Sequence, residues 1–232
     1  MSPALSVVVP VRSLAGGKTR LAGVLTPEER EIVVRRMLAH TLATVAASGI
    51  SGETLVVSPD PAARAFAREA GASVLAQSPA APGLNAAIAL GREHAAGTGT
   101  SALLVLFADL PLLHAVDLRR LAHDPSPVVI SCDRHGTGTN ALLLRLDRGA
   151  GAFVPRFGEG SAASHCAEAA MRGLDTSLAS VPGVAFDLDT PEDWWAFLDI
   201  APDVADGWGL LSAGAPTLAG CAVGGAFAEA AW

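Results

Sequence analysis

The sequence predicts an α/β fold in which a mostly parallel, mixed sheet lies between two layers of helices. Short β-branched segments alternate with segments that carry helix-capping residues over most of the first 200 positions. This alternation is typical of parallel strands joined by crossover helices. The segment 103–107, LLVLF, is apolar without interruption, which indicates a strand buried on both faces. We therefore expect a three-layer α/β/α sandwich.

The elements of the first 131 residues can be placed in order. Strands are expected at 6–10, 54–57, 73–76, 103–107 and 127–131, and helices at 26–47, 60–71, 84–94 and through Leu118 and Leu121. The first helix has the clearest start, with Thr26 as N-cap, Pro27 in the first turn and Glu29 closing a capping box. Its buried stripe is predicted to be Ile32, Val33, Met37, Leu38, Leu42 and Val45.

The pattern changes after Cys132. A turn-rich loop is expected at 133–139, a strand at 140–146, a glycine loop at 157–161 with a helix after it, a last strand at 183–188 and a final helix capped by Thr190. Trp194 and Trp195 in that helix are assigned to core packing. We assign residues 1–200 to one domain and residues 201–232 to a Gly/Ala-rich extension. Whether this extension is a packing segment or a loose tail stays open.

Composition limits the class of protein. Half of the 232 residues are hydrophobic and 17% are charged, which suits one well-packed domain. The net charge of −7 speaks against a nucleic-acid surface but allows a nucleotide bound through magnesium. Cys132, Cys166 and Cys221 are far apart, so reduced thiols are expected. Without a signal segment or a membrane span, a cytoplasmic protein is expected.

A glycine-rich basic segment follows the first strand. The run GGKT at 16–19 is reminiscent of a P-loop, but that motif needs a glycine where Arg12 stands and a helix that opens at the Lys-Thr pair. Here the helix signal arrives only at Thr26. A loop that covers a nucleoside triphosphate fits better, because glycines let backbone N–H groups approach phosphate and cations offset its charge; a solvated surface loop is the alternative. The candidate ligands are Arg12, Gly16, Gly17, Lys18 and Arg20.

Asp109 follows the central apolar strand. Pro111 disfavours helix at the residue before it, so the strand ends in a turn here. The carboxyl ends of strands are where such sheets bind ligands. Asp109 is therefore a candidate site residue, with capping of the next helix as the alternative.

Several blocks of the chain, taken together, resemble the GT-A-like nucleotidyltransferases, and more narrowly the CofC/FbiD family of guanylyltransferases in coenzyme F420 biosynthesis. The resemblance covers residues 5–198. The matching blocks are VPVRSLAGGKTRL at 9–21, LNAA at 84–87, ADLP at 108–111, Asp133 with GTGTN at 136–140, RFG at 156–158 with Ser161 and His165, and DLDTP at 187–191. Arg12 departs from the pattern, because family members usually have lysine there; arginine keeps the charge with a planar fork.

The resemblance implies transfer of GMP from GTP to the phosphate of phosphoenolpyruvate or 2-phospho-L-lactate, with release of pyrophosphate. Lys18, Arg20 and Asp109 would be catalytic, and Asn85 would contact the guanine or the ribose. The small phosphorylated acid would be held by Thr139, Gly158 and Ser161, and Mg²⁺ by Asp109, Asp187 and Asp189. The acids are too similar for the sequence to separate them, and it leaves the number of subunits open, with a homodimer as one option.

The chemistry of these residue types agrees with that implication. Hard oxygen ligands suit Mg²⁺, and residues two apart on an extended segment, such as Asp187 and Asp189, point the same way. Their alternative role, helix capping, is already filled by Thr190. A phosphomonoester is ionised near neutral pH and needs no general base. His165 is more often a surface or capping residue in such a position, whereas Ser161 is expected to cap its helix while backbone N–H groups there bind an anion.

Two rival functions stay open at this point. One is another nucleotidyltransferase of the same fold, acting on a sugar phosphate or on molybdopterin. The other is a regulatory domain that binds GTP without transferring any group.

Overall fold

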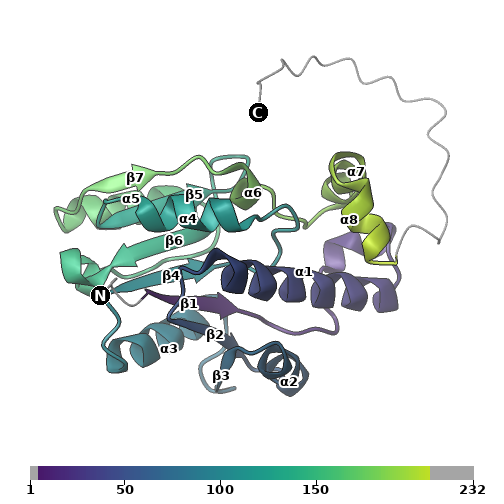
Figure 1. The fold of residues 1–232 in the computed structure, drawn as a ribbon, viewed down its shortest axis with the longest axis horizontal. Helices are drawn as coiled ribbons and strands as arrows, with labels where there is room; N and C mark the ends of the chain where they lie inside the picture. Colours follow the sequence, from purple (N-terminus) through teal and green to yellow (C-terminus); the bar gives the residue numbers. More distant parts are fainter. Residues whose placement is uncertain (1–4, 210–232) are drawn as a thin grey trace, which may run out of the picture.

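The computed structural model describes residues 5–209, which form a seven-stranded sheet between helices (Figure 1). The strand order is β3-β2-β1-β4-β6-β5-β7; β6 runs antiparallel to β4 and β5, and the other pairs are parallel. The strands are β1 Leu5–Pro10, β2 Glu53–Ser58, β3 Ser73–Ala76, β4 Ala102–Leu106, β5 Val128–Cys132, β6 Thr139–Arg145 and β7 Thr176–Leu178. The predicted mixed, mostly parallel sheet is confirmed.

Helices cover both faces of this sheet (Figure 1). The α-helices are α1 Pro27–Ser48, α2 Pro61–Glu69, α3 Leu84–Gly97, α4 Ala115–His123, α5 Ser161–Met171, α6 Pro182–Ala185, α7 Pro191–Ile200 and α8 Pro202–Gly207. Three short 3-10 helices lie at η1 Thr19–Gly23, η2 Leu146–Arg148 and η3 Ala150–Ala152. One core joins the sheet to α1, α2, α4 and α6, and another joins it to α3 and α5.

The central strands of the sheet are buried on both faces. Every residue of β4 is buried, as its uninterrupted apolar run predicts. Helix α3 lies so close to β1 that a Cβ at Gly91 would come within 2.6 Å of Val8 Cγ1. Glycine at position 91 is what permits this contact.

The point where the strand order reverses lies between β1 and β4, because β1 connects outward to β2 whereas β4 begins the other half of the sheet. The loop after β1 and the turn after β4 both leave the sheet at this point. Crevices at such switch points are the usual ligand sites of open α/β sheets.

Helix α1 confirms its predicted start. Thr26 Oγ1 accepts a hydrogen bond from the Glu29 N–H at 3.2 Å, and Glu29 Oε2 accepts one from the Thr26 N–H at 2.8 Å. The assignment of Ile32 to the buried stripe is wrong, since this residue is 40% exposed. Val33, also predicted for this stripe, is buried as expected, because it lies one helical step of about 100° from Ile32.

The predicted strand at 183–188 is also wrong. Pro182 begins the short helix α6, and the segment after it is irregular. Phe186 and Leu188 are buried beneath α7, so their alternation reflects burial against a helix and not sheet pairing. The seventh strand is instead β7. The sequence does not predict it, because it is only three residues long and lies at the sheet edge.

The last described segment packs against the end of the domain. Trp194 is buried as expected, whereas Trp195 is 40% exposed, which corrects its assignment to the core. In α8, Ala205 is buried, and Trp208 after it lies 4.9 Å from the Phe197 ring between centroids. The proposed extension 201–232 is thus only partly within the described residues, and its boundary stays a prediction. Cys132 and Cys166 carry free thiols, and Cys221 lies outside the described residues. No helix within 5–209 is long and apolar enough to cross a membrane.

Candidate active site

A cleft of about 990 Å³ opens at the carboxyl ends of β1 and β4. The loop after β1 lines one wall, including Arg12, Gly16, Gly17 and Lys18, and the connection between β3 and α3 lines another. Asp109 and Asp189 also line the cleft. The structure therefore brings the predicted basic loop and two of the predicted aspartates to one cleft.

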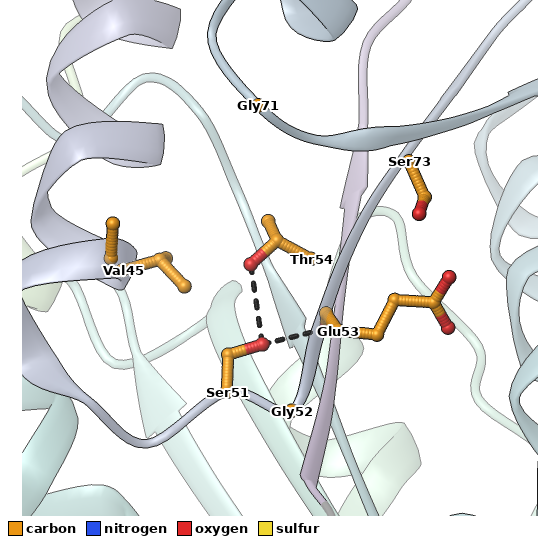
Figure 2. Close-up of a pocket in the computed structure, with 8 residues that line it drawn as sticks. Val45, Ser51, Gly52, Glu53, Thr54, Gly71 and Ser73 are labelled. Carbon is orange, nitrogen blue, oxygen red and sulfur yellow. Dashed lines mark hydrogen bonds between the residues drawn. The ribbon is translucent and has the colours of Figure 1, made fainter.

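A second pocket of about 310 Å³ lies at the start of β2, at the end of the sheet opposite the cleft (Figure 2). In Figure 2, the Thr54 hydroxyl donates to Ser51 Oγ at 3.2 Å, and Ser51 Oγ donates to the Glu53 carbonyl oxygen at 2.6 Å. Within the described part of the chain, its lining includes no lysine or arginine. The hydroxyls of Ser51 and Thr54 are already paired and the lining offers no lysine or arginine, so we assign the phosphate chemistry to the first cleft.

The basic loop has an unusual backbone. Gly16 has φ +73°, and Lys18 has φ +52°, the only positive φ at a non-glycine residue between 5 and 209. A left-handed lysine costs conformational energy, and such costs gather at functional sites. Asp60 holds the loop in place, since its Oδ2 accepts hydrogen bonds from the Ser13 hydroxyl and the Leu14 N–H, both at 3.0 Å.

Asp60 gives a first prediction. The Asp60→Ala variant is expected to lose about 1–2 kcal/mol of unfolding free energy at pH 7, because Asp60 also caps α2 through the Ala62 N–H. Burial opposes ionisation, but the hydrogen bonds from Leu14, Ala62 and Ser13 outweigh it and lower the pKa of Asp60. A lowered carboxyl pKa contributes stability above its ordinary value and loses it as pH falls through the folded value.

Urea unfolding at pH 7 and at pH 3 measures this contribution. The difference between wild type and Asp60→Ala should shrink at pH 3. Asp199→Ala, an exposed aspartate in α7, serves as the control and should change stability by less than about 0.5 kcal/mol. An equal loss at both pH values would contradict the role of the ionised carboxylate.

Lys18 connects the loop after β1 to the two aspartates of the cleft. Its Nζ lies 2.6 Å from Asp109 Oδ2 and 3.4 Å from Asp189 Oδ1. Arg20 Nη1 lies 2.6 Å from Asp189 Oδ2. The Leu188 N–H donates to the Asp109 carbonyl oxygen at 3.0 Å, which brings the segment 187–189 beside the end of β4. Asp109 therefore forms an ion pair with Lys18 and does not cap α4, whose N-cap is His114.

The electrostatics follow from this arrangement. Burial alone would lower the pKa of Lys18, but the charges and hydrogen bonds of Asp109 and Asp189 outweigh it and raise the pKa. The pKa of Asp187 is raised, first by burial and then by the negative charge of Asp109. Asn140 stabilises Asp187 through Nδ2, which lies 3.4 Å from Asp187 Oδ1. Around Asp187, therefore, burial and the charge of Asp109 together outweigh the effect of the Lys18 charge.

The aspartates fit a divalent cation. Asp109 Oδ1 is buried and has no hydrogen-bond partner, although such atoms are normally paired. The pKa of Asp187 is raised by burial and by the charge of Asp109, and the positive charge of Lys18 offsets this only in part. Among residues 5–209, no three acidic, histidine or cysteine side chains already form a metal-binding cluster. Oxygen donors of this kind suit a hard cation.

Of the residues assigned to the acid substrate, Gly158 lies shortly before α5, Ser161 begins α5, and Thr139 contacts α5 through His165. Gly158 has φ +138°, a conformation that favours glycine, and its carbonyl accepts from the Ser161 N–H at 3.1 Å. Ser161 does not cap the helix as expected; Gly160 is the N-cap, and Ser161 is the first residue of α5. His165 is fully buried and contacts Thr139, which corrects its assignment to the surface: its neighbours are aromatic rings of the core, not solvent.

Asn85 lies at the start of α3, but its amide contacts protein. Its Nδ2 donates to the Phe157 carbonyl oxygen at 2.9 Å, and its Oδ1 accepts from the Phe157 N–H at 2.8 Å. The assignment of Asn85 to the guanine or ribose stays a prediction.

Three contributors were missed or underrated in the sequence. The sequence predicts only a helix start at Asp60 and a surface or capping position for His165, and it indicates no separate role for Asn140 at the end of the GTGTN block. Each acts through a partner 26 to 47 positions away in the chain. The matching blocks themselves were the one signal that could have indicated Asn140 and His165.

This architecture, with a basic glycine loop that faces strand-end aspartates across a switch-point cleft, is the fold that nucleotidyltransferases share with GT-A-like glycosyltransferases. Solved structures share the fold. A nucleotidyl transferase from Methanothermobacter thermautotroptrophicus has a TM-score of 0.63 and 21% identity, with 88% of this chain and 99% of that chain covered. Glucosyl-3-phosphoglycerate synthase from Mycobacterium tuberculosis, in complex with Mn²⁺ and UDP, has a TM-score of 0.54 and 14% identity, covering 78% and 70%.

Sequence comparison identifies the family. The profile of the family described as "Guanylyl transferase CofC like" matches residues 5–199, so the chain belongs to that family. A phosphoenolpyruvate guanylyltransferase from Rubrobacter xylanophilus is 44% identical over 189 residues, 80% of this chain and 89% of the relative. One from Sphaerobacter thermophilus is 40% identical over 188 residues, 80% and 88%.

Proposed function

We propose that this protein transfers GMP from GTP to the phosphate of phosphoenolpyruvate, or of the related 2-phospho-L-lactate, in coenzyme F420 biosynthesis. The names of the relatives support the acceptor. The observation that carries the proposal is the shared Lys18 ammonium between Asp109 and Asp189 in the cleft. The other nucleotidyltransferases of this fold and a non-catalytic GTP-binding domain are not favoured by the family membership.

The reaction is a displacement at phosphorus. An oxygen of the acceptor phosphate attacks the α-phosphorus of GTP and forms a new P–O bond. The bond between the α-phosphorus and the oxygen that bridges to the β-phosphate breaks, and pyrophosphate leaves with that electron pair. The acceptor phosphate is mostly ionised near neutral pH, its second pKa being about 6, so no side chain has to remove a proton.

The chain's own groups have to offset the repulsion between two anions and hold them in line. We assign Arg12, Lys18 and Arg20, with the backbone at Gly16 and Gly17, to the triphosphate. Arg12 is exposed at the cleft and forms no ion pair with residues 5–209. The side chains of Thr139 and Ser161 and the backbone of Gly158 are assigned to the acid.

Asp109, Asp187 and Asp189 are the proposed ligands of Mg²⁺. The orphaned Asp109 Oδ1 supports this assignment. When bound, the ion would neutralise phosphate charge and fix the direction of attack. The cytoplasmic location, the homodimer and the division at residue 200 stay predictions.

A matrix of substrates tests the function. The pure protein is incubated with Mg²⁺, one of GTP, CTP and UTP, and one of the two phospho-acids or a sugar phosphate. Pyrophosphate release is followed, and the products are weighed by mass spectrometry. The expected product is a guanylylated phospho-acid formed only with GTP. Product from CTP or UTP with a sugar phosphate, or GTP binding without pyrophosphate release for any acceptor, would contradict the proposal.

Asn85 gives a second prediction. Because its amide holds the backbone of Phe157, Asn85→Ala is expected to raise the KM for the phospho-acid about tenfold and to leave the KM for GTP within about twofold. Steady-state kinetics with each substrate varied in turn measures both. Glu93→Ala, an exposed change in the same helix, is the control. An increase confined to the KM for GTP would instead support direct contact of Asn85 with the nucleotide.

A further inference from the structure

His165 is a fully buried histidine that contacts two segments of the site. Its Nε2 lies 3.0 Å from the backbone nitrogen of Arg156, and its Nδ1 lies 3.1 Å from Thr139 Oγ1. The ring packs against Phe153 and Phe157, with centroids 6.0 and 4.8 Å away. The imidazole thus joins the start of β6 to the loop that precedes α5.

These two contacts determine where the proton of the ring lies. A backbone N–H only donates, so Nε2 must accept from Arg156 and carry no proton of its own. A neutral imidazole has one N–H, which is then on Nδ1 and donates to Thr139 Oγ1. Burial lowers the pKa of His165 to about 4, so the ring is neutral at pH 7. The charged form would place a second proton on Nε2 against the Arg156 N–H.

The direction of this bond leaves the Thr139 hydroxyl hydrogen free. Thr139 Oγ1 accepts from His165, and no other hydrogen bond of this hydroxyl is formed with residues 5–209. Thr139 begins β6, which runs antiparallel to β4. It therefore lies at the same end of the sheet as Asp109, which follows β4. Its neighbour Asn140 accepts from the Phe107 N–H at 3.1 Å and donates toward Asp187. The free O–H therefore lies at the end of the sheet to which we assign the reacting phosphates.

We propose that His165 is a positioning residue: its Nδ1–H holds the Thr139 oxygen as an acceptor, so that the Thr139 hydroxyl must donate to an anionic oxygen of the acid substrate. At the same time its Nε2 holds the Arg156 N–H and thereby orients the loop that ends at Gly158. This inference rests on the proposed function, since it deepens the role of Thr139 in binding the acid.

The first test reads the tautomer without substrate. Two-bond ¹H–¹⁵N spectra of the labelled full-length protein at pH 7 should show one histidine with Nδ1 protonated and Nε2 unprotonated. The signal is assigned by its loss in His165→Asn. A His165 signal with the proton on Nε2, or a doubly protonated ring, would overturn the proposal. This result does not depend on whether the protein transfers GMP.

The second test uses kinetics and a double-mutant cycle. His165→Phe keeps a ring in the core but removes both hydrogen bonds; it is expected to raise the KM for the phospho-acid about tenfold or more, with the KM for GTP within about twofold. His165→Asn places an amide N–H near the Nδ1 position and should restore much of the loss. In a Thr139→Val background, His165→Phe should raise this KM by a smaller factor than in wild type, because the bond between His165 and Thr139 is already lost and only the contact with the Arg156 N–H is left to remove.

Two outcomes contradict the positioning role. Equal increases in both KM values would indicate a merely structural role, and so would effects of His165→Phe and Thr139→Val that multiply independently. Thermal melts identify a variant that fails to fold. If His165→Phe does not fold, His165→Asn is compared with Thr139→Val. An increase in the KM for the phospho-acid that is as large in His165→Asn as in Thr139→Val overturns the proposal. If wild type forms no product with either acid while the tautomer is as expected, the proposed function has failed and the proton position of His165 still stands.

Discussion

The Asp109→Asn variant is expected to transfer GMP at least about a hundredfold more slowly than wild type at saturating substrates. Preorganised charge at a reacting phosphate contributes effects of this order. Asp109 touches Lys18 and keeps its other oxygen unpaired, and asparagine replaces a carboxylate by a neutral amide of the same shape. Initial rates of pyrophosphate release, with the protein's melting temperature measured alongside, give the result.

Asp175→Asn is the matched control for this change. Asp175 is exposed and precedes β7, at the end of the sheet away from the cleft, so the variant should keep the wild-type rate within about twofold. Calorimetric titration of the nucleotide-free protein with Mg²⁺ should show weaker binding in Asp109→Asn only. Near-normal turnover in that variant would remove Asp109 from the catalytic machinery.

The Lys18→Met variant is expected to lose about 100- to 1,000-fold in kcat/KM for GTP. Its side chain is only 11% exposed and its ammonium is shared by Asp109 and Asp189. Methionine keeps the apolar length of the side chain but removes the charge, so the two carboxylates face the triphosphate with less compensation. Arg36→Met removes one positive charge from the exposed surface of α1 and should change kcat/KM by less than about twofold.

Lys18 is the only lysine of the 232 residues, which allows a chemical test of the same assignment. Periodate-oxidised GTP carries a dialdehyde that reacts with amines, and it should label Lys18 in a manner prevented by excess GTP. Because Asp109 and Asp189 hold the pKa of Lys18 above its ordinary value, acetylation at pH 8 should be faster in Asp109→Asn than in wild type. Labelling of the N-terminal amine serves as the internal reference. Equal acetylation of Lys18 in both proteins would contradict the ion pair.

The fold could be predicted wherever local signals and burial agree. The apolar run of β4 and the capping box of α1 are properties of neighbouring residues, and both were confirmed. The failures occurred where burial arises from distant packing. Phe186 and Leu188 alternate like a strand, yet they are buried under α7, and β7 has too few residues to show any period.

The sequence by itself determined an α/β sandwich, the end of the sheet that carries the site, and the chemical kinds of residue there: a basic glycine loop and strand-end carboxylates. These follow from short-range patterns and from where parallel strands end. Only the tertiary structure decided that one ammonium is shared by Asp109 and Asp189, that Asn85 holds Phe157, and that His165 contacts Thr139. The physical reason is that hydrogen bonds and ion pairs depend on distances of about 3 Å, and the strand order and helix packing set those distances between residues 26 to 171 positions apart.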